Sequence, residues 1–132
     1  MLGQDVIRFD GTVRDNLEVA RNFQNLENLS DERLTDALKK VNLNIKLDQD
    51  IRSLSGGEMQ RVAIARIALL EKEVYLMDEP SSALDKKTED FVIKTFIESL
   101  KGKTLIFVTH SKELAEKYAD DIIEVAGGKI NE

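Results

Sequence analysis

The sequence predicts an α/β fold in which a mostly helical part, residues 1–70, precedes a parallel β-α-β-α-β part, residues 71–132. The main observation is a set of short, continuous apolar runs, which are typical of strands buried on both faces of a parallel sheet. These runs lie at 74–77, 104–109 and 121–126. The second observation is that stretches with helical apolar spacing lie between the runs, at 87–100 and 111–119. This alternation is the pattern of a parallel α/β sheet.

The helical part contains three predicted helices. Thr12 begins the first, with Asp15 three residues later in a weaker form of the capping box. Ser30 is a favourable N-cap for the second, since acidic residues follow it in the first turn. A loop is expected over 42–53, and the third helix covers 56–70.

Composition excludes several classes of protein. The chain has a net charge of -6, whereas a surface that binds nucleic acid is basic, so no nucleic-acid partner is expected. The chain has no cysteine, which excludes a disulfide framework and thiol chemistry. The longest apolar stretch, 62–70, is interrupted by Arg66 and is too short to span a bilayer. No signal peptide is expected, because residues 1–10 lack an apolar core. If the protein acts at a membrane, another segment or another chain must therefore supply the membrane-spanning part.

The start of the third helix carries an unexplained feature. Ser55 and Glu58 form the S-x-x-E pattern of a capping box, and a capped amphipathic helix would account for both. It does not account for Gly56 and Gly57, because alanine is the better helix former. Glycine is favoured where a ligand approaches the backbone, and a helix N-terminus offers free N–H groups to a phosphate. The alternative predictions are thus a simple cap and a phosphate contact.

Polar residues follow two of the predicted strands. Asp78 and Glu79 come directly after the run at 74–77, and His110, the only histidine, follows 104–109. Ligands of open α/β sheets bind beyond the carboxyl ends of the strands. One carboxylate could hold Mg²⁺ while the other orients a water, a division of labour that phosphoryl transfer requires. The alternatives are a solvated acidic turn and a histidine without catalytic function.

Five motifs of this sequence, in the order in which they occur along the chain, resemble those of ATP-binding cassette (ABC) ATPases. "LSGGEMQRVAIARIAL" resembles the family's signature motif, and "VYLMDEPSSALD" its Walker B motif and D-loop. "VTH" at 108–110 resembles the switch histidine, and "GQDVIRFDGTVRDNL" the Q-loop with the segment after it. The resemblance covers essentially the whole chain. It implies a partial P-loop NTPase fold, with 1–70 as Q-loop, helical subdomain and signature helix and 71–132 as part of the α/β core.

The resemblance also implies a role for each matching residue, with ATP and Mg²⁺ as cofactors. Ser55, Gly56, Gly57 and Glu58 would bind ATP held by the opposite subunit of a head-to-tail dimer. Asp78 would serve Mg²⁺, Glu79 would polarise the attacking water, and His110 would contact the γ-phosphate. Gln4 would touch the metal or the water and couple the site to a membrane partner. The D-loop would cross the dimer interface; its residues are Ser81, Ser82, Ala83, Leu84 and Asp85.

The chain lacks the P-loop, G-x-x-x-x-G-K-[ST], with which cassettes hold their own nucleotide. "GKT" at 102–104 has isoleucine, not glycine, five residues before its glycine, and it precedes a strand, so it is a turn. We therefore expect the chain alone to be inactive. For activity it would need a Walker A half, by which we mean an N-terminal part of a cassette that carries the P-loop (Walker A motif). This expectation holds whether the chain is a truncation, a split protein or a degraded one. Missing strands would also leave exposed sheet edges and apolar surface, which predicts self-association.

The implied function is the ATPase subunit, or part of one, of a membrane transporter. Its partners would be a transmembrane permease and a second ABC subunit, and its place the cytoplasmic face of the membrane. Two alternatives stay open: a non-catalytic half-cassette that docks on a transporter and regulates it, and a non-transport cassette protein. The interval 5–54 has no sustained heptads, which disfavours the coiled-coil insertions of chromosome-maintenance cassettes.

Overall fold

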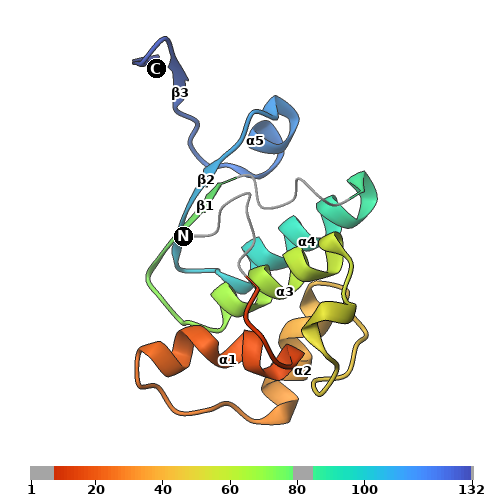
Figure 1. The fold of residues 1–132 in the computed structure, drawn as a ribbon. Helices are drawn as coiled ribbons and strands as arrows, with labels where there is room; N and C mark the ends of the chain where they lie inside the picture. The colour runs from red at the N-terminus through yellow and green to blue at the C-terminus, as the bar shows by residue number, and fades with distance from the viewer. Residues whose placement is uncertain (1–7, 79–84, 132) are drawn as a thin grey trace.

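A computed structural model describes residues 8–78 and 85–131, and the fold is given for these. The helices are α1 (Val13–Phe23), α2 (Asp31–Lys40), a 3₁₀ turn η1 (Ile51–Ser53), α3 (Gly56–Ala68), α4 (Lys86–Ser99) and α5 (Lys112–Tyr118). The strands are β1 (Val74–Asp78), β2 (Thr104–Val108), β3 (Glu124–Ala126) and β4 (Lys129–Asn131). Figure 1 shows α1 and α2 on one side of α3, with α4 and the β1–β2 sheet on the other.

The predicted helix starts are confirmed. Thr12 and Asp15 form a reciprocal capping box at the start of α1. The Ser30 side chain accepts a hydrogen bond from the Arg33 N–H at the start of α2. Each helix therefore begins where a short polar side chain can take up an N–H group that has no acceptor within the helix.

Helix α3 forms the centre of the core. It packs against α1, α2 and α4, so buried side chains, most of them apolar, occupy much of its circumference. Most of the largest fully buried apolar side chains come from the helical half, and Val92 comes from α4; those of the helical half are Val13, Leu17, Leu34, Leu38, Ile51, Val62 and Ile64. This packing fixes α3, and with it the turn at 55–58, relative to α1.

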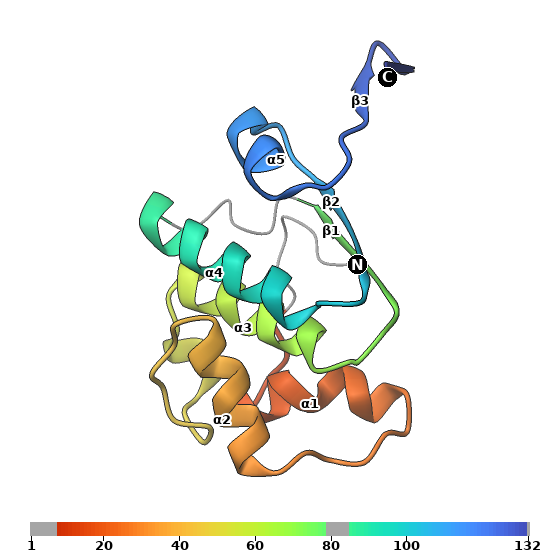
Figure 2. The same ribbon diagram turned by 180° about the vertical axis from the view of Figure 1, so that it is seen from behind.

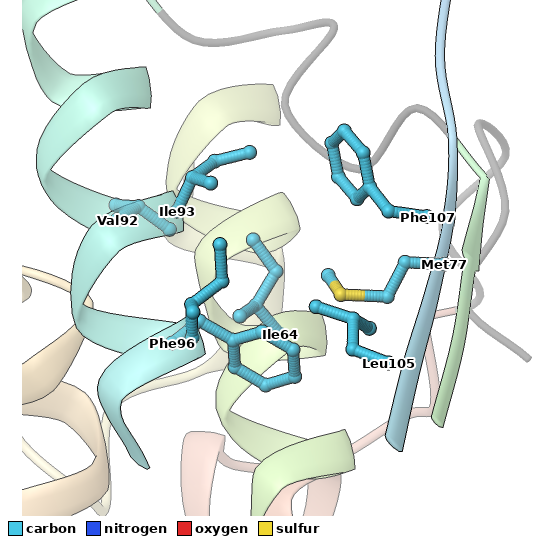
Figure 3. A pocket seen from close by; sticks show the side chains of 8 residues that line it. Ile64, Met77, Val92, Ile93, Phe96, Leu105 and Phe107 are labelled. Carbon is cyan, nitrogen blue, oxygen red and sulfur yellow. The ribbon is translucent and has the colours of Figure 1, made fainter. Parts of the chain in front are cut away.

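The β1–β2 sheet is parallel, as predicted, and its register runs from Val74 opposite Thr104 to Asp78 opposite Val108. One face packs on α3 and α4, where Met77 and Phe107 approach Ile64 and Phe96 across a small apolar gap (Figure 3). The other face is open. The expectation of strands buried on both faces is therefore wrong for the described part of the chain, because nothing there covers that second face.

The third predicted strand does not extend this sheet. Residues 124–126 form β3, which pairs antiparallel with β4 in a separate hairpin. Gly127 and Gly128 make the two-residue turn with φ of +58° and +76°, a backbone conformation that glycine adopts without strain. The predicted turn at these glycines is confirmed, whereas the predicted parallel pairing of this strand is wrong. The hairpin projects away from the sheet and the helices (Figure 1).

Candidate functional site

The turn of residues 55–58, which we call the signature turn, begins α3 at the protein surface. The Ser55 hydroxyl accepts the Glu58 N–H at 3.2 Å, and Glu58 Oε1 accepts the Ser55 N–H at 3.0 Å. Hydrogen bonding from the Ser55 N–H is the main reason why the pKa of Glu58 is lowered. The predicted capping box is confirmed, and at neutral pH it holds a carboxylate beside the helix N-terminus.

Gly56 is exposed, and the chain's own structure gives no reason for a glycine there. Its φ lies outside the left-handed region, and an added Cβ would meet none of the described atoms within 4 Å. The first N–H groups of a helix have no acceptor within the helix, and they carry partial positive charge. Gly56 therefore presents bare backbone, with anion-binding character, to whatever approaches the start of α3.

The segment before the signature turn is tied to the start of α1. The Ile51 N–H donates to the Gly11 carbonyl at 3.0 Å, and the Val13 N–H donates to the Gln49 carbonyl at 2.9 Å. Thr12 and Asp50 form an isolated antiparallel bridge between these hydrogen bonds. The signature turn is thus anchored at both ends, by α3 and by this junction.

We expect an acid-sensitive contribution to stability from the junction between residues 49–52 and the start of α1. Arg52 donates to the Asp50 carboxylate from its side chain and its backbone N–H, and the side-chain hydrogen bond is the largest cause lowering the pKa of Asp50 to about 2. A lowered pKa stabilises the fold above the ordinary value of 3.8, and this contribution disappears as pH falls toward about 2. Urea unfolding is measured between about pH 5 and 2. As the pH falls, the free energy of unfolding should decrease less for Asp50→Asn than for the unmodified chain.

The control for this prediction is Asp36→Asn, which removes an exposed carboxylate from α2. Its acid-side loss of unfolding free energy should match that of the unmodified chain. Equal pH profiles for the Asp50 and Asp36 variants would contradict the assignment.

Asp78 and His110 lie at the same edge of the sheet. Asp78 is the last residue of β1 and pairs in register with Val108, two residues before His110. The Asp78 side chain is half-buried, and His110 is exposed. The structure thus brings these two predicted site residues to the carboxyl end of the parallel strands, where ligands of such sheets bind.

The other predicted residues divide into two groups. Gln4, Glu79 and the D-loop residues 81–84 lie outside the described residues. Asp85 is described: its carboxylate caps α4, accepting the Thr88 N–H at 2.9 Å and the Thr88 hydroxyl at 2.8 Å. The backbone hydrogen bond from Thr88 is the main cause of the lowered pKa of Asp85. Asp85 is therefore the N-cap of α4, a structural function that was not predicted from the sequence.

A buried polar cluster between α1 and α3 was not predicted from the sequence. The wholly buried Asn16 side chain accepts the Phe9 N–H at 2.9 Å and donates to the Phe9 carbonyl at 2.8 Å. Arg66 donates from Nε to the Asn16 carbonyl at 2.6 Å and from Nη2 to Asn16 Oδ1 at 3.2 Å, and its guanidinium lies 5.4 Å from the Phe9 ring centroid. Burial lowers the pKa of Arg66. The only signal in the sequence was an arginine interrupting an apolar run.

The ABC transporter family model matches residues 3–82, well over half of the chain. The chain belongs to the ABC transporter family. ABC transporter I family member 17 of Arabidopsis thaliana is 38% identical over 137 residues, covering 100% of this chain and 51% of the relative. An energy-coupling factor transporter ATP-binding protein of Lactobacillus acidophilus is 33% identical over 129 residues, covering 96% of this chain and 45% of the relative.

A solved structure agrees with this assignment. A putative ABC transporter ATP-binding protein from Pyrococcus furiosus superposes with a TM-score of 0.76 at 26% identity, covering 84% of this chain and 56% of that chain. The predicted partial ABC ATPase fold is therefore confirmed. This ABC chain spans about half the length of each of these three proteins. Among its described residues, none of the helices combines the length and apolar character needed to cross a membrane.

Proposed function

We propose that this chain is the signature-motif half of a nucleotide-binding subunit that powers transport across a membrane by ATP-driven, head-to-tail dimerisation. ATP hydrolysis is the activity of the ABC ATPase family to which the chain belongs. In this proposal, residues 1–70 carry the Q-loop, the helical subdomain and the signature helix. Residues 71–132 carry the Walker B motif, the D-loop and the switch histidine.

The signature turn is proposed to bind the γ-phosphate of ATP held by the opposite subunit. The observation that carries this proposal is the bare backbone of Gly56 at a capped, exposed helix N-terminus. Ser55, Gly57 and Glu58 complete the turn around it. A phosphate at this position would meet N–H groups and the positive end of α3, and no side chain of Gly56 would block it.

The carboxyl end of the sheet is proposed to hold the reacting end of a second ATP. The half-buried Asp78 carboxylate suits Mg²⁺, which is commonly bound by one or two carboxylates together with phosphates and waters. His110, at the same edge of the sheet, would contact the γ-phosphate. For Glu79 and Gln4 the proposal rests on the sequence match: Glu79 would orient the attacking water, and Gln4 would sense the metal or water. The D-loop, residues 81–85, would cross the interface between subunits.

A Walker A half is the required partner for catalysis. The P-loop supplies the backbone N–H groups and the lysine that hold the β- and γ-phosphates, and this sequence has no P-loop. The strands of the Walker A half would pair with the edges of the β1–β2 sheet, and its other elements would cover the open face. Without that half, we expect the chain neither to bind ATP tightly nor to hydrolyse it.

The remaining partners are a transmembrane permease and a second ABC subunit. Relatives include fused ATP-binding and permease proteins, such as a glutathione/L-cysteine transport protein of Haemophilus influenzae that is 34% identical over 142 residues. The helical part would meet the permease, which places the chain at the cytoplasmic face of the membrane as a peripheral subunit.

Complementation tests this proposal. Phosphate release from ATP and Mg²⁺ is measured for the chain alone, for a separately expressed Walker A half from a relative, and for their mixture. Activity is expected only in the mixture, and Glu79→Gln should reduce it at least about 100-fold if Glu79 positions the attacking water. An assembled mixture without activity, together with capture of an intact transporter, would favour the regulatory half-cassette instead.

A further inference from the structure

Two buried arginines connect α1 and α3, one from each helix. Arg66, near the end of α3, donates to the carbonyl and the side chain of Asn16 in α1, at 2.6 and 3.2 Å. Arg21, in the last turn of α1, donates from Nη1 to the carbonyl of Leu69, the C-cap of α3, at 3.0 Å. Each arginine is only 8% exposed. Both views show the two helices side by side (Figures 1 and 2). Directional hydrogen bonds therefore add to the apolar packing that holds α3 against α1.

Hydrogen bonds and apolar packing constrain the position of α3 differently. Apolar contacts are non-directional, and a repacked core loses its unique arrangement before it loses stability. A hydrogen bond requires a donor–acceptor distance of about 3 Å and a well-aligned angle. A shift of α3 by one residue combines a rise of about 1.5 Å with a turn of about 100°, which would carry the Arg66 side chain away from Asn16. The arginine contacts thus distinguish one register of α3 from its neighbours.

The start of α1 holds the signature turn from two sides. Before the turn, residues 49–51 are hydrogen-bonded through their backbone to residues 11–13. After the turn, Arg66 is hydrogen-bonded to Asn16, the fourth residue of α1. Helix α3 is unbroken between the signature turn and Arg66, so the turn must move with any displacement of the helix. The position of the signature turn is therefore set relative to α1 at both ends.

We propose that Arg66 and Arg21 are positioning residues: their contacts with Asn16 and the Leu69 carbonyl fix α3 in one register against α1, and so hold the signature turn in one place. This inference deepens the proposed function, and its consequence for ATP rests on that function. In this proposal the buried arginines provide a unique arrangement rather than stability, since apolar groups of similar volume are often at least as stable in such places.

The register is measured on the chain alone, without nucleotide. The chain has no cysteine, so spin labels can be attached at Asn22→Cys, exposed on α1, and at Gly56→Cys, where an added Cβ meets no described atom within 4 Å. Double electron–electron resonance then gives the distribution of distances between the labels. The distribution should be narrow, and it should become at least about twice as wide when Arg66→Met is added. Arg21→Met should act in the same way, and it is the second variant should Arg66→Met not fold. Arg33→Met, at an exposed arginine of α2, is the matched control and should leave the width unchanged.

Dimerisation of the complemented protein connects the register to the phosphate. With a Walker A half and Glu79→Gln present, Arg66→Met should raise the dissociation constant of the ATP-dependent dimer at least about tenfold, because a displaced signature turn contacts the phosphate poorly. The affinity of the undimerised complex for ATP should stay unchanged, since the P-loop holds that nucleotide. General destabilisation would instead weaken both. The helical circular dichroism of the variant should match that of the unmodified chain.

Two results would overturn the proposal. One is a distance distribution that is as narrow with the arginine substitutions as without them. The other is an ATP-dependent dimer that forms equally well with Arg66→Met although the distribution has widened. The distance measurement decides the register claim even if the unmodified mixture does not dimerise with ATP, so a failure of the proposed function would be recognised separately.

Discussion

Replacing Gly56 with alanine should leave the chain as stable as before, or more stable, and yet reduce the ATPase activity of the complemented protein at least tenfold. Alanine is the better helix former, and its Cβ would meet no described atom within 4 Å. The loss of activity would come from the methyl group standing between the backbone of α3 and the incoming phosphate. Urea unfolding and phosphate release, measured on the same preparation, check the two halves of this prediction.

Lys112→Ala is the matched control. Lys112 is the exposed first residue of α5, as Gly56 is the exposed first residue of α3. Alanine there should change neither the unfolding free energy by more than about 0.5 kcal/mol nor the activity. Full activity of Gly56→Ala would indicate that the glycine does not face a ligand and that the signature turn acts only as a helix cap.

Asn16→Leu should lower the free energy of unfolding by about 2–4 kcal/mol, because it removes the partners of several buried polar groups. Arg66 Nη2 loses its acceptor Asn16 Oδ1, and the Phe9 N–H and carbonyl lose the amide that binds both. The leucine side chain has as many heavy atoms as asparagine and is not smaller, so it leaves no cavity and the cost comes from unsatisfied polar groups. Urea unfolding of the purified chain measures it.

A double variant separates this mechanism from simple repacking. With Arg66→Met already present, no buried charge is left behind, so Asn16→Leu should then cost at least about 1 kcal/mol less than it does alone. Asn22→Ala, at an exposed position on the same helix, should change stability by no more than about 0.5 kcal/mol. Strict additivity of the Asn16 and Arg66 substitutions would contradict the proposed coupling.

Local signals in the sequence were sufficient to predict the helix starts and the central strand pair. Thr12, Ser30 and Ser55 cap the helices that they were predicted to begin, since capping depends on residues only three positions apart. The apolar runs at 74–77 and 104–109 became β1 and β2, in parallel register. Parallel pairing then placed Asp78 and His110 at one edge without further information.

Features that depend on distant partners could not be predicted in this way. The run at 121–126 resembles the other two strands, but whether it joins their sheet depends on the neighbours available, and here it pairs with β4 across the Gly127–Gly128 turn. The burial of both sheet faces likewise depends on elements elsewhere. Asn16 and Arg66 are 50 residues apart, so no local pattern could reveal their contact.

The most direct test of the central claim is whether ATP joins two complemented subunits through the signature turn. The chain with Glu79→Gln, mixed with a Walker A half, is examined by sedimentation velocity with and without ATP and Mg²⁺. We predict that ATP doubles the mass of the complex, and that adding Gly56→Asp abolishes this doubling by placing a negative charge against the γ-phosphate. An ATP-dependent dimer that forms equally well with aspartate at position 56 would contradict the assignment of the signature turn to the phosphate.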